Sequence, residues 1–168
     1  APAKTDIDAI AHIADKRQLS AAIGKTLRAD TDPLNATNFQ TENLFGIFVT
    51  QGLTTPGAAI PYLMQGGIGL PEREYYLSSD KEMVRLRDEY RAYVRQILQL
   101  AEYPDPQGAA NRILDLETKI ARAHATRAES EDFAAGAVVW TRAELERHAP
   151  GIDWPALLVC SVENTRWP

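Results

Sequence analysis

The residues and motifs that this chain lacks limit the chemistry that it could perform. Cys160 is its one cysteine in 168 residues, so no internal disulfide can form, and the compartment cannot be inferred from cysteine content. Its three histidines, His12, His124 and His148, lie far apart, and no H-E-x-x-H string occurs. That string places two zinc-binding histidines one helical turn apart, with a glutamate base between them. We therefore expect no catalytic residue, no cofactor site and no metal site in this chain.

Basic charge is also in short supply. Eighteen Lys and Arg residues stand against 23 Asp and Glu residues, for a net charge of −5. A nucleic-acid surface would need clustered basic residues, with aromatic residues among them for stacking on single strands. We expect no nucleic-acid partner. The first residues also lack the apolar core of a signal peptide.

One uncharged stretch, from Asn43 to Pro71, is long enough to span a bilayer. Two prolines and six glycines interrupt it, which argues against a transmembrane helix. Its two short segments rich in β-branched and aromatic residues, 44–50 and 59–65, are joined by the turn-forming sequence GLTTPGA. This pattern predicts an antiparallel β-hairpin, with Pro56 in the loop, where it costs no ladder hydrogen bond.

Helical periodicity accounts for most of the remaining chain, so the predicted fold class is mainly α, with one small antiparallel hairpin at about 44–50 and 59–65. The other predicted elements, in chain order, are two short helices in 5–28, a loop at 29–38, an irregular connection at 66–77, a long helix from Ser79 or Asp80 to about Ala101, a helix capped by Asp105 that runs to about Arg127, a short helix opened by the Thr141–Glu144 capping box, and a last turn or two from Asp153.

Gln65–Leu77, QGGIGLPEREYYL, is the most informative segment. It resembles the Q-x-G-L-G-L-P-x-R-x-Y-Y signature of the neprilysin-like zinc metallopeptidases, the family of neprilysin and endothelin-converting enzyme. FQTENLFGIFVTQ precedes it, and RLRDEYRAYVRQILQLAEYPDP, ILDLETKIARAHATRAESED and WTRAELERHAPGIDW follow in the family's order. The resemblance implies that residues 1–158 are a partial non-catalytic N-terminal domain, cut from a longer peptidase.

The ten residues after Leu158, VCSVENTRWP, show neither a helical period nor the expected continuation. We expect 159–168 to be a tail foreign to the family that does not pack on the domain.

Several residues admit both a chemical and a structural interpretation. Gly66–Gly69 could be a phosphate loop, but the Lys and Ser/Thr of such loops are absent, so we favour a turn. Glu72 and Glu74 could be an acid/base pair, but Arg73 between them favours an ion pair, with the tyrosines packed in the core.

Glu117 and His124 share a helix face and could join Asp132 at a metal, although three ligands from one such segment are uncommon. We favour packing roles. The family usually has Arg-Asp where this chain has Glu131-Asp132, which puts any ion-pair role there in doubt. The predicted structural signature residues are Gln65, Gly69, Pro71, Arg73, Tyr75, Tyr76, Glu117 and His124.

The resemblance implies part of the non-catalytic lobe of a zinc metalloendopeptidase that shapes and restricts an active-site chamber for peptides. Zinc would lie in the parent's catalytic domain, the partner of this lobe, in a periplasmic, secreted or membrane-anchored protein. The Ala- and Arg-rich composition suggests a bacterial source. Without that partner, self-association is expected. The alternative is a free-standing helical interaction module, which the absence of H-E-x-x-H downstream in the same gene would favour.

Overall fold

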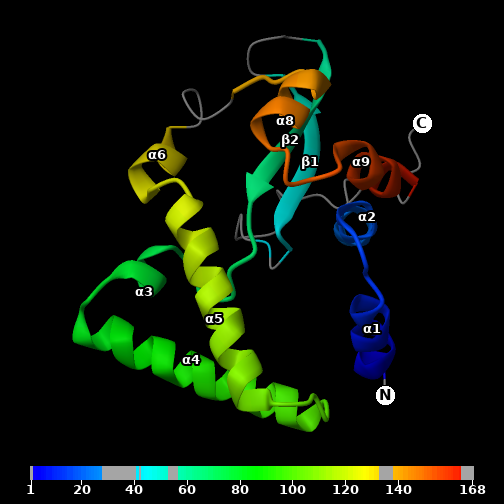
Figure 1. Ribbon diagram of the computed structural model, residues 1–168. Coiled ribbons are helices and arrows are strands. Elements are labelled where there is room, and N and C mark those ends of the chain that lie inside the picture. The colour runs from blue at the N-terminus through cyan, green and yellow to red at the C-terminus, as the bar shows by residue number, and fades with distance from the viewer. Residues whose placement is uncertain (1, 28–40, 42, 53–56, 133–137, 164–168) are drawn as a thin grey trace.

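The computed structural model describes residues 2–27, 41, 43–52, 57–132 and 138–163, and these residues form helices around one two-stranded sheet (Figure 1). The mainly α prediction with a small hairpin is confirmed. The loop predicted at 29–38 lies outside the described residues. The elements, in chain order, are α1 (Pro2–Ala11), α2 (Lys16–Thr26), β1 (Phe45–Gln51), β2 (Ala59–Gln65), α3 (Glu74–Leu77), α4 (Lys81–Leu100), α5 (Pro106–Ala123), α6 (Arg127–Glu131), α8 (Arg142–His148) and α9 (Trp154–Glu163).

The hairpin predicted within the uncharged stretch is present. β1 and β2 pair antiparallel in a register that sets Phe48 opposite Tyr62, and the two rings stack with centroids 5.2 Å apart. Pro61 pairs with Val49, a position that a two-stranded sheet tolerates because each strand is an edge. No helix among the described residues is long and apolar enough to cross a membrane.

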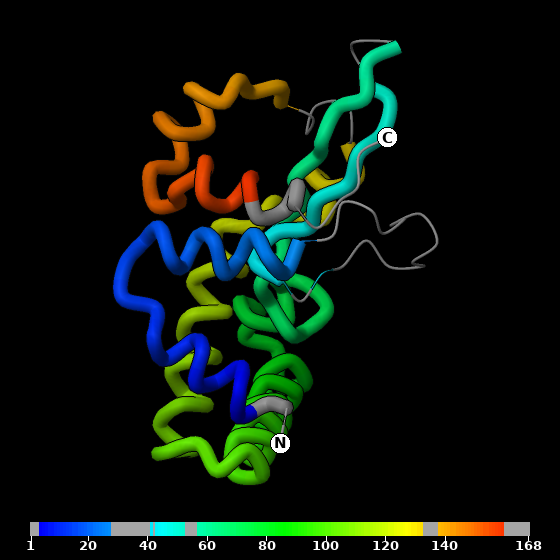
Figure 2. The backbone as a smooth tube through the Cα atoms, turned by 90° about the vertical axis from the view of Figure 1, so that its right-hand side faces the viewer, coloured from blue at the N-terminus to red at the C-terminus, as the bar shows by residue number. Residues whose placement is uncertain are grey.

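One hydrophobic core joins the two ends of the chain. Leu27, Trp154 and Leu157 are buried together, and Phe45 of β1 packs against them with its ring 6.0 Å from that of Trp154. α2 and α9 lie side by side (Figures 1 and 2). Gly24 permits this approach, because a Cβ there would lie 2.2 Å from the carbonyl oxygen of Leu157.

A second core lies at the other end of the molecule, between α3, α4 and α5. Tyr76, Leu114 and Ala121 are buried there, and residues of the 66–77 segment pack against them. α4 and α5 form an antiparallel pair connected by residues 101–105 (Figure 1). Asp105 adopts a left-handed conformation with φ 51°, and its carboxylate accepts a hydrogen bond from Gly108 N at 2.9 Å, which starts α5 as predicted.

Four predictions about where elements begin or end were wrong. The first of the two helices predicted in 5–28 begins earlier, at Pro2. The helix expected to reach Arg127 ends at Ala123, because Thr126 caps a new helix, α6, in a capping box with Glu129. The connection expected to be irregular contains one helical turn, α3.

The last helix also exceeds the expected turn or two, since the apolar run WPALLVCSVE stays helical to Glu163. Residues Val159 to Glu163 therefore continue α9. Val159 is exposed, and the packing of the 159–168 segment stays a prediction.

Gly24→Ala should destabilise the protein. Alanine raises helix propensity by about 1 kcal/mol, but the added methyl group would push α2 away from the backbone of α9. Overpacking of this kind costs about 1–3 kcal/mol, so we expect a net loss in urea unfolding. Gly151→Ala is the matched control, because its Cβ would meet nothing within 4 Å. Equal stability of the two variants would contradict the close α2–α9 contact.

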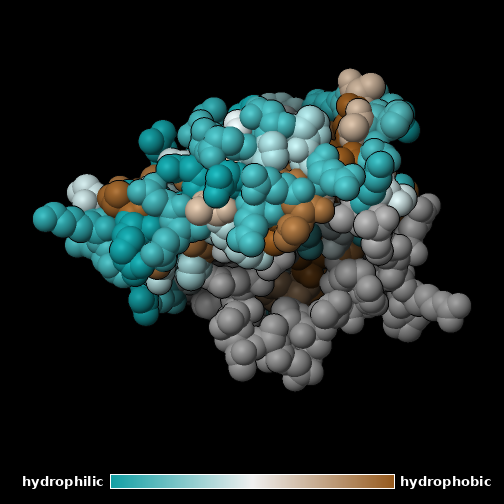
Figure 3. Space-filling model, turned by 90° about the horizontal axis from the view of Figure 1, so that it is seen from below, coloured by the Kyte–Doolittle hydropathy of each residue, from teal (hydrophilic) through white to brown (hydrophobic). Residues whose placement is uncertain are grey.

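The outer side of α4 exposes an apolar stripe. Tyr93, Ile97 and Leu100, spaced by four and three residues, are 59%, 46% and 76% exposed, and no residue of α4 is fully buried. Hydrophobic residues also interrupt the largely hydrophilic face seen in Figure 3. Covering 100 Å² of such surface is worth about 2.5 kcal/mol, so an uncovered stripe favours association.

We expect the isolated chain to self-associate at micromolar concentration or to bind a hydrophobic dye and unfold at low temperature. Sedimentation and thermal unfolding measure these outcomes. Replacing Leu100 by Gln should shift the chain toward monomer. A monodisperse monomer with a sharp, high melting transition and no dye binding would show that the exposed stripe has no such effect.

Candidate functional site

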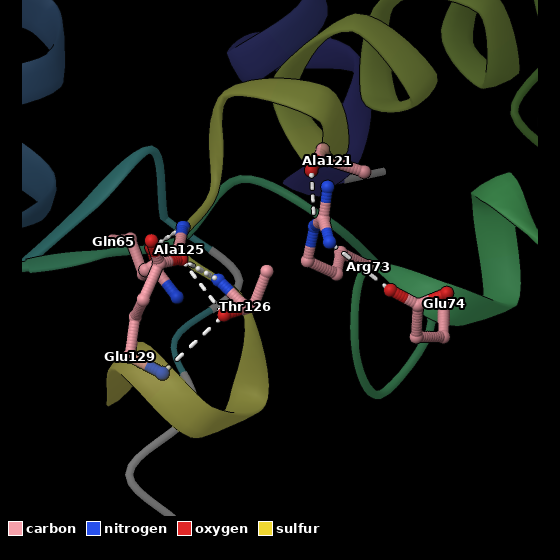
Figure 4. A network of polar contacts seen from close by, with 7 residues as sticks. All are labelled: Gln65, Arg73, Glu74, Ala121, Ala125, Thr126 and Glu129. Atoms are coloured by element: carbon pink, nitrogen blue, oxygen red, sulfur yellow. Dashed lines mark hydrogen bonds and ion pairs between the residues drawn. The ribbon is translucent and has the colours of Figure 1, made fainter. Parts of the chain in front are cut away.

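The signature segment begins where β2 ends, and two contacts tie that point to the end of α5. His124 Nε2 lies 2.9 Å from the carbonyl oxygen of Gly66. The backbone N–H of Ala125 donates to Gln65 Oε1 at 2.9 Å (Figure 4). A carbonyl oxygen only accepts, so His124 Nε2 carries the hydrogen. The last residues of the strand are thereby fixed to the corner between α5 and α6.

Tyr76 is the centre of the signature segment. Its buried hydroxyl accepts hydrogen bonds from the backbone N–H groups of Gly69 at 3.1 Å and Leu70 at 2.8 Å. The same hydroxyl donates to Glu117 Oε2 at 2.8 Å, and Tyr90 donates to Glu117 Oε1 at 3.0 Å. One carboxylate on α5 therefore binds both α3 and α4.

Burial raises the pKa of the Tyr76 phenol, and the neighbouring Glu117 carboxylate raises it further, while the Leu70 amide opposes the shift. The phenol therefore remains protonated across the neutral range and keeps its role as donor. A Cβ on Gly69 would lie 2.1 Å from the Tyr90 hydroxyl. Glycine at this position thus makes room for the tyrosine that completes the cluster.

Arg73 reaches from the loop to the end of α5. Its Nε donates to the carbonyl oxygen of Ala121 at 3.3 Å, and its Nη1 lies 3.1 Å from Glu74 Oε1 (Figure 4). A cation at the carboxyl end of a helix also interacts favourably with the helix dipole. Arg87 of α4 donates to the carbonyl oxygens of Tyr75 and Ser78, at 2.8 and 2.9 Å, and so fixes both ends of α3.

This geometry favours structural roles for the signature residues. The Gly69 and Leu70 amides, which a phosphate loop would offer to a ligand, point at Tyr76 instead. Glu117 and His124 of the considered metal site contact different partners. In the part of the chain that the structure describes, no group of three His, Cys, Asp or Glu side chains could hold a metal ion.

Two contributors to the cluster were not singled out from the sequence, Tyr90 and Arg87. Tyr90 lies within the long helix predicted from Ser79 or Asp80 to about Ala101, and nothing in the helical spacing marks its hydroxyl as a partner of Glu117. Arg87 is one of many arginines in the same helix. Both roles depend on contacts between elements distant in sequence, which periodicity does not reveal.

The family model described as peptidase family M13, for its N-terminal region, matches residues 1–165. The chain belongs to peptidase family M13. The M13 match continues past Leu158, into the segment 159–168 that was predicted to be foreign to the family.

Among curated proteins, the chain is similar to endothelin-converting enzyme 1 of Cavia porcellus and of Homo sapiens. Each is 27% identical over 128 residues, which is 74% of this chain but 17% and 16% of those enzymes.

Among solved structures, the open state of the zinc metalloprotease Zmp1 of Mycobacterium tuberculosis superposes with a TM-score of 0.78. The identity is 25%, over 95% of this chain and 23% of that chain. The inhibitor complex of the same enzyme gives the same TM-score at 24% identity. The chain thus spans less than a quarter of the length of these M13 relatives, and it corresponds to their N-terminal region.

Tyr76→Phe should destabilise this region of the M13 chain. Removing the hydroxyl deprives two backbone N–H groups of their acceptor and Glu117 of one donor, at a cost of about 1–3 kcal/mol. Urea unfolding measures the loss. Tyr93→Phe, at a 59% exposed position of α4, should change the free energy of unfolding by less than about 0.5 kcal/mol. Similar values for both variants would contradict the central role of Tyr76.

Proposed function

We propose that this chain is part of the non-catalytic lobe of an M13 zinc metalloendopeptidase that acts on peptides, and that its contribution is to shape the active-site chamber and restrict access to it. The observation that carries the proposal is the use of the signature residues. Tyr76, Glu117 and His124 use their polar groups to hold the segment in place, and Arg73 uses its Nε in the same way. A rigid wall is what such a role requires.

The zinc does not fit the residues of this chain. The sequence contains no H-E-x-x-H, and the described part has no three-ligand cluster. We therefore place the zinc, and the Lewis-acid chemistry that it supplies, in a catalytic domain of the parent protein. That domain is the proposed partner of this lobe, and the proposed setting is a periplasmic, secreted or membrane-anchored protein of bacterial origin.

The isolated chain should neither retain zinc nor cleave peptides. Elemental analysis after dialysis should find far less than one zinc per chain, and an internally quenched peptide should remain intact. One bound zinc together with peptidase activity would overturn the assignment of this chain to the non-catalytic lobe.

The lobe function itself is tested in the full-length parent. Two substrates would carry the same cleavable sequence, one as a short peptide and the other as a surface loop of a folded protein. We expect a higher kcat/KM for the short peptide. We define the preference as kcat/KM for the short peptide divided by kcat/KM for the folded protein. Tyr76→Phe, which loosens the lobe, should reduce this preference without changing the zinc content. Tyr93→Phe should leave the preference unchanged.

If Tyr76→Phe leaves the preference for the short peptide unchanged, the proposed role in restricting access is contradicted. Absence of H-E-x-x-H from the rest of the reading frame would instead favour a free-standing interaction module.

A further inference from the structure

A cavity of about 420 Å³ lies between the signature loop and the corner where α5 meets α6. Its polar wall includes Gln65, Glu72, Arg73, His124, Arg127 and Ser130. In Figure 4, Gln65, Ala125 and Thr126 lie on one side of the view, and Arg73 and Glu74 lie on the other. This volume falls within the range of small-ligand sites, which combine concavity with a few convergent polar groups.

The acceptors around this cavity are mostly occupied by the protein itself. Gln65 Oε1 accepts from Ala125 N, and the Gly66 carbonyl contacts His124 Nε2. Glu129 Oε2 accepts from both the N–H and the hydroxyl of Thr126, at 2.7 and 2.8 Å. These bonds hold the wall rigid, and among the lining side chains the Glu72 carboxylate remains as an acceptor.

Several donors remain. Within the described part of the chain, the Gln65 amide NH₂ and the Ser130 hydroxyl make no hydrogen bond. Arg73 uses Nε and Nη1, and Arg127 uses only Nε, toward Glu131 at 3.1 Å. The cavity therefore offers a surplus of N–H and O–H groups, which suits a ligand made of acceptors.

The charges limit the ligand to a small anion. Arg73 and Arg127 are permanently cationic, although Glu74 and Glu131 pair with them and the Glu129 carboxylate also interacts with the charge of Arg73. Glu72 lines the same cavity and would repel an anion. A singly charged planar group fits this balance better than a doubly charged phosphate, and guanidinium groups match carboxylates in a two-pronged geometry.

We propose that this cavity binds the carboxylate of a peptide, through Arg73, Arg127 and the amide NH₂ of Gln65. The carboxylate belongs either to an internal acidic side chain or to a chain end, since both present the same two oxygens. The choice of a peptide as the ligand rests on the proposed peptidase function, whereas the carboxylate chemistry rests on the cavity itself.

The test titrates the isotope-labelled chain with three capped tripeptides and follows its backbone amide resonances. One tripeptide is acetyl-Ala-Glu-Ala-amide, with only a side-chain carboxylate. A second is acetyl-Ala-Ala-Ala with a free C-terminus, and acetyl-Ala-Gln-Ala-amide is the neutral control. We expect saturable shifts in 65–73 and 125–130 with a Kd on the order of 1 mM for at least one carboxylate peptide, and none for the control.

Which carboxylate peptide binds identifies the source of the group. Binding of neither, equal shifts with the neutral peptide, or tighter binding of inorganic phosphate would overturn the proposal.

Three variants test the proposal, because each should change the Kd in a different direction or not at all. Arg127→Gln should weaken binding about fivefold. Arg142→Gln is the matched control, because Arg142 also lies in a helix, pairs with Glu146 four residues later and is similarly exposed. It should leave the Kd unchanged. Glu72→Gln should tighten binding about twofold by removing the opposing charge. Equal effects of the two arginine variants, or weaker binding by Glu72→Gln, would refute the site.

Discussion

The packing of α3, α4 and α5 depends on one interaction, in which the carboxylate of Glu117 binds two tyrosine hydroxyls. Each of its oxygens accepts one O–H, from Tyr76 and from Tyr90. Tyr76 accepts two backbone N–H groups in turn. Hydrogen bonds arranged in such a chain polarise and strengthen one another. A single side chain on α5 therefore fixes the loop, α3 and α4 at once, and it meets the cost of partial burial with charge-assisted bonds.

A second series of contacts connects this region to the core formed by Leu27, Trp154 and Leu157. Asn43, just before β1, donates its side-chain amide to the Thr26 carbonyl at the end of α2, at 3.1 Å. Gly66, just after β2, packs so closely beneath Asn43 that a Cβ would lie 2.2 Å from the Asn43 carbonyl oxygen. His124 then contacts the Gly66 carbonyl. The base of the hairpin thus joins α2 to α5 through short polar contacts and one close backbone approach, instead of through a continuous hydrophobic core.

Local signals in the sequence predicted most elements because each signal acts within a few residues. The strand pattern and the caps at Asp80 and Asp105 depend on neighbouring groups only, and the structure has them where they were expected. The missed boundary is instructive, because Thr126–Glu129 and Thr141–Glu144 are the same tetrapeptide, Thr-Arg-Ala-Glu, and both form complete capping boxes. The sequence did not predict the first capping box because it follows directly on a strongly periodic helix. The helical spacing of that helix can be extended through Thr126 without a break.

The partners of the signature residues could not be predicted in the same way. The pairing of Glu117 with Tyr90, and the need for glycine at 24 and 69, arise where elements distant in sequence approach each other. A stripe of apolar residues predicts that a face is buried, but it does not give the partner or the distance of approach. The resemblance to a known family identified Gly69 and Glu117 but neither Tyr90 nor Gly24, and only the packing supplies the reason for each.

Those reasons explain how packing alone can fix the residues of a sequence signature. Gly69 leaves room for the Tyr90 hydroxyl, Tyr76 collects two loop amides, and Arg73 satisfies a carbonyl at the end of α5. Each requirement is geometric, and the requirements are coupled, because Gly69 faces the tyrosine that bonds to the same carboxylate as Tyr76. Changing one member leaves a buried polar group of another without its partner, at a cost of about 1–3 kcal/mol. The arrangement holds a loop against two helices, and it thereby specifies a residue pattern as strictly as an active site does.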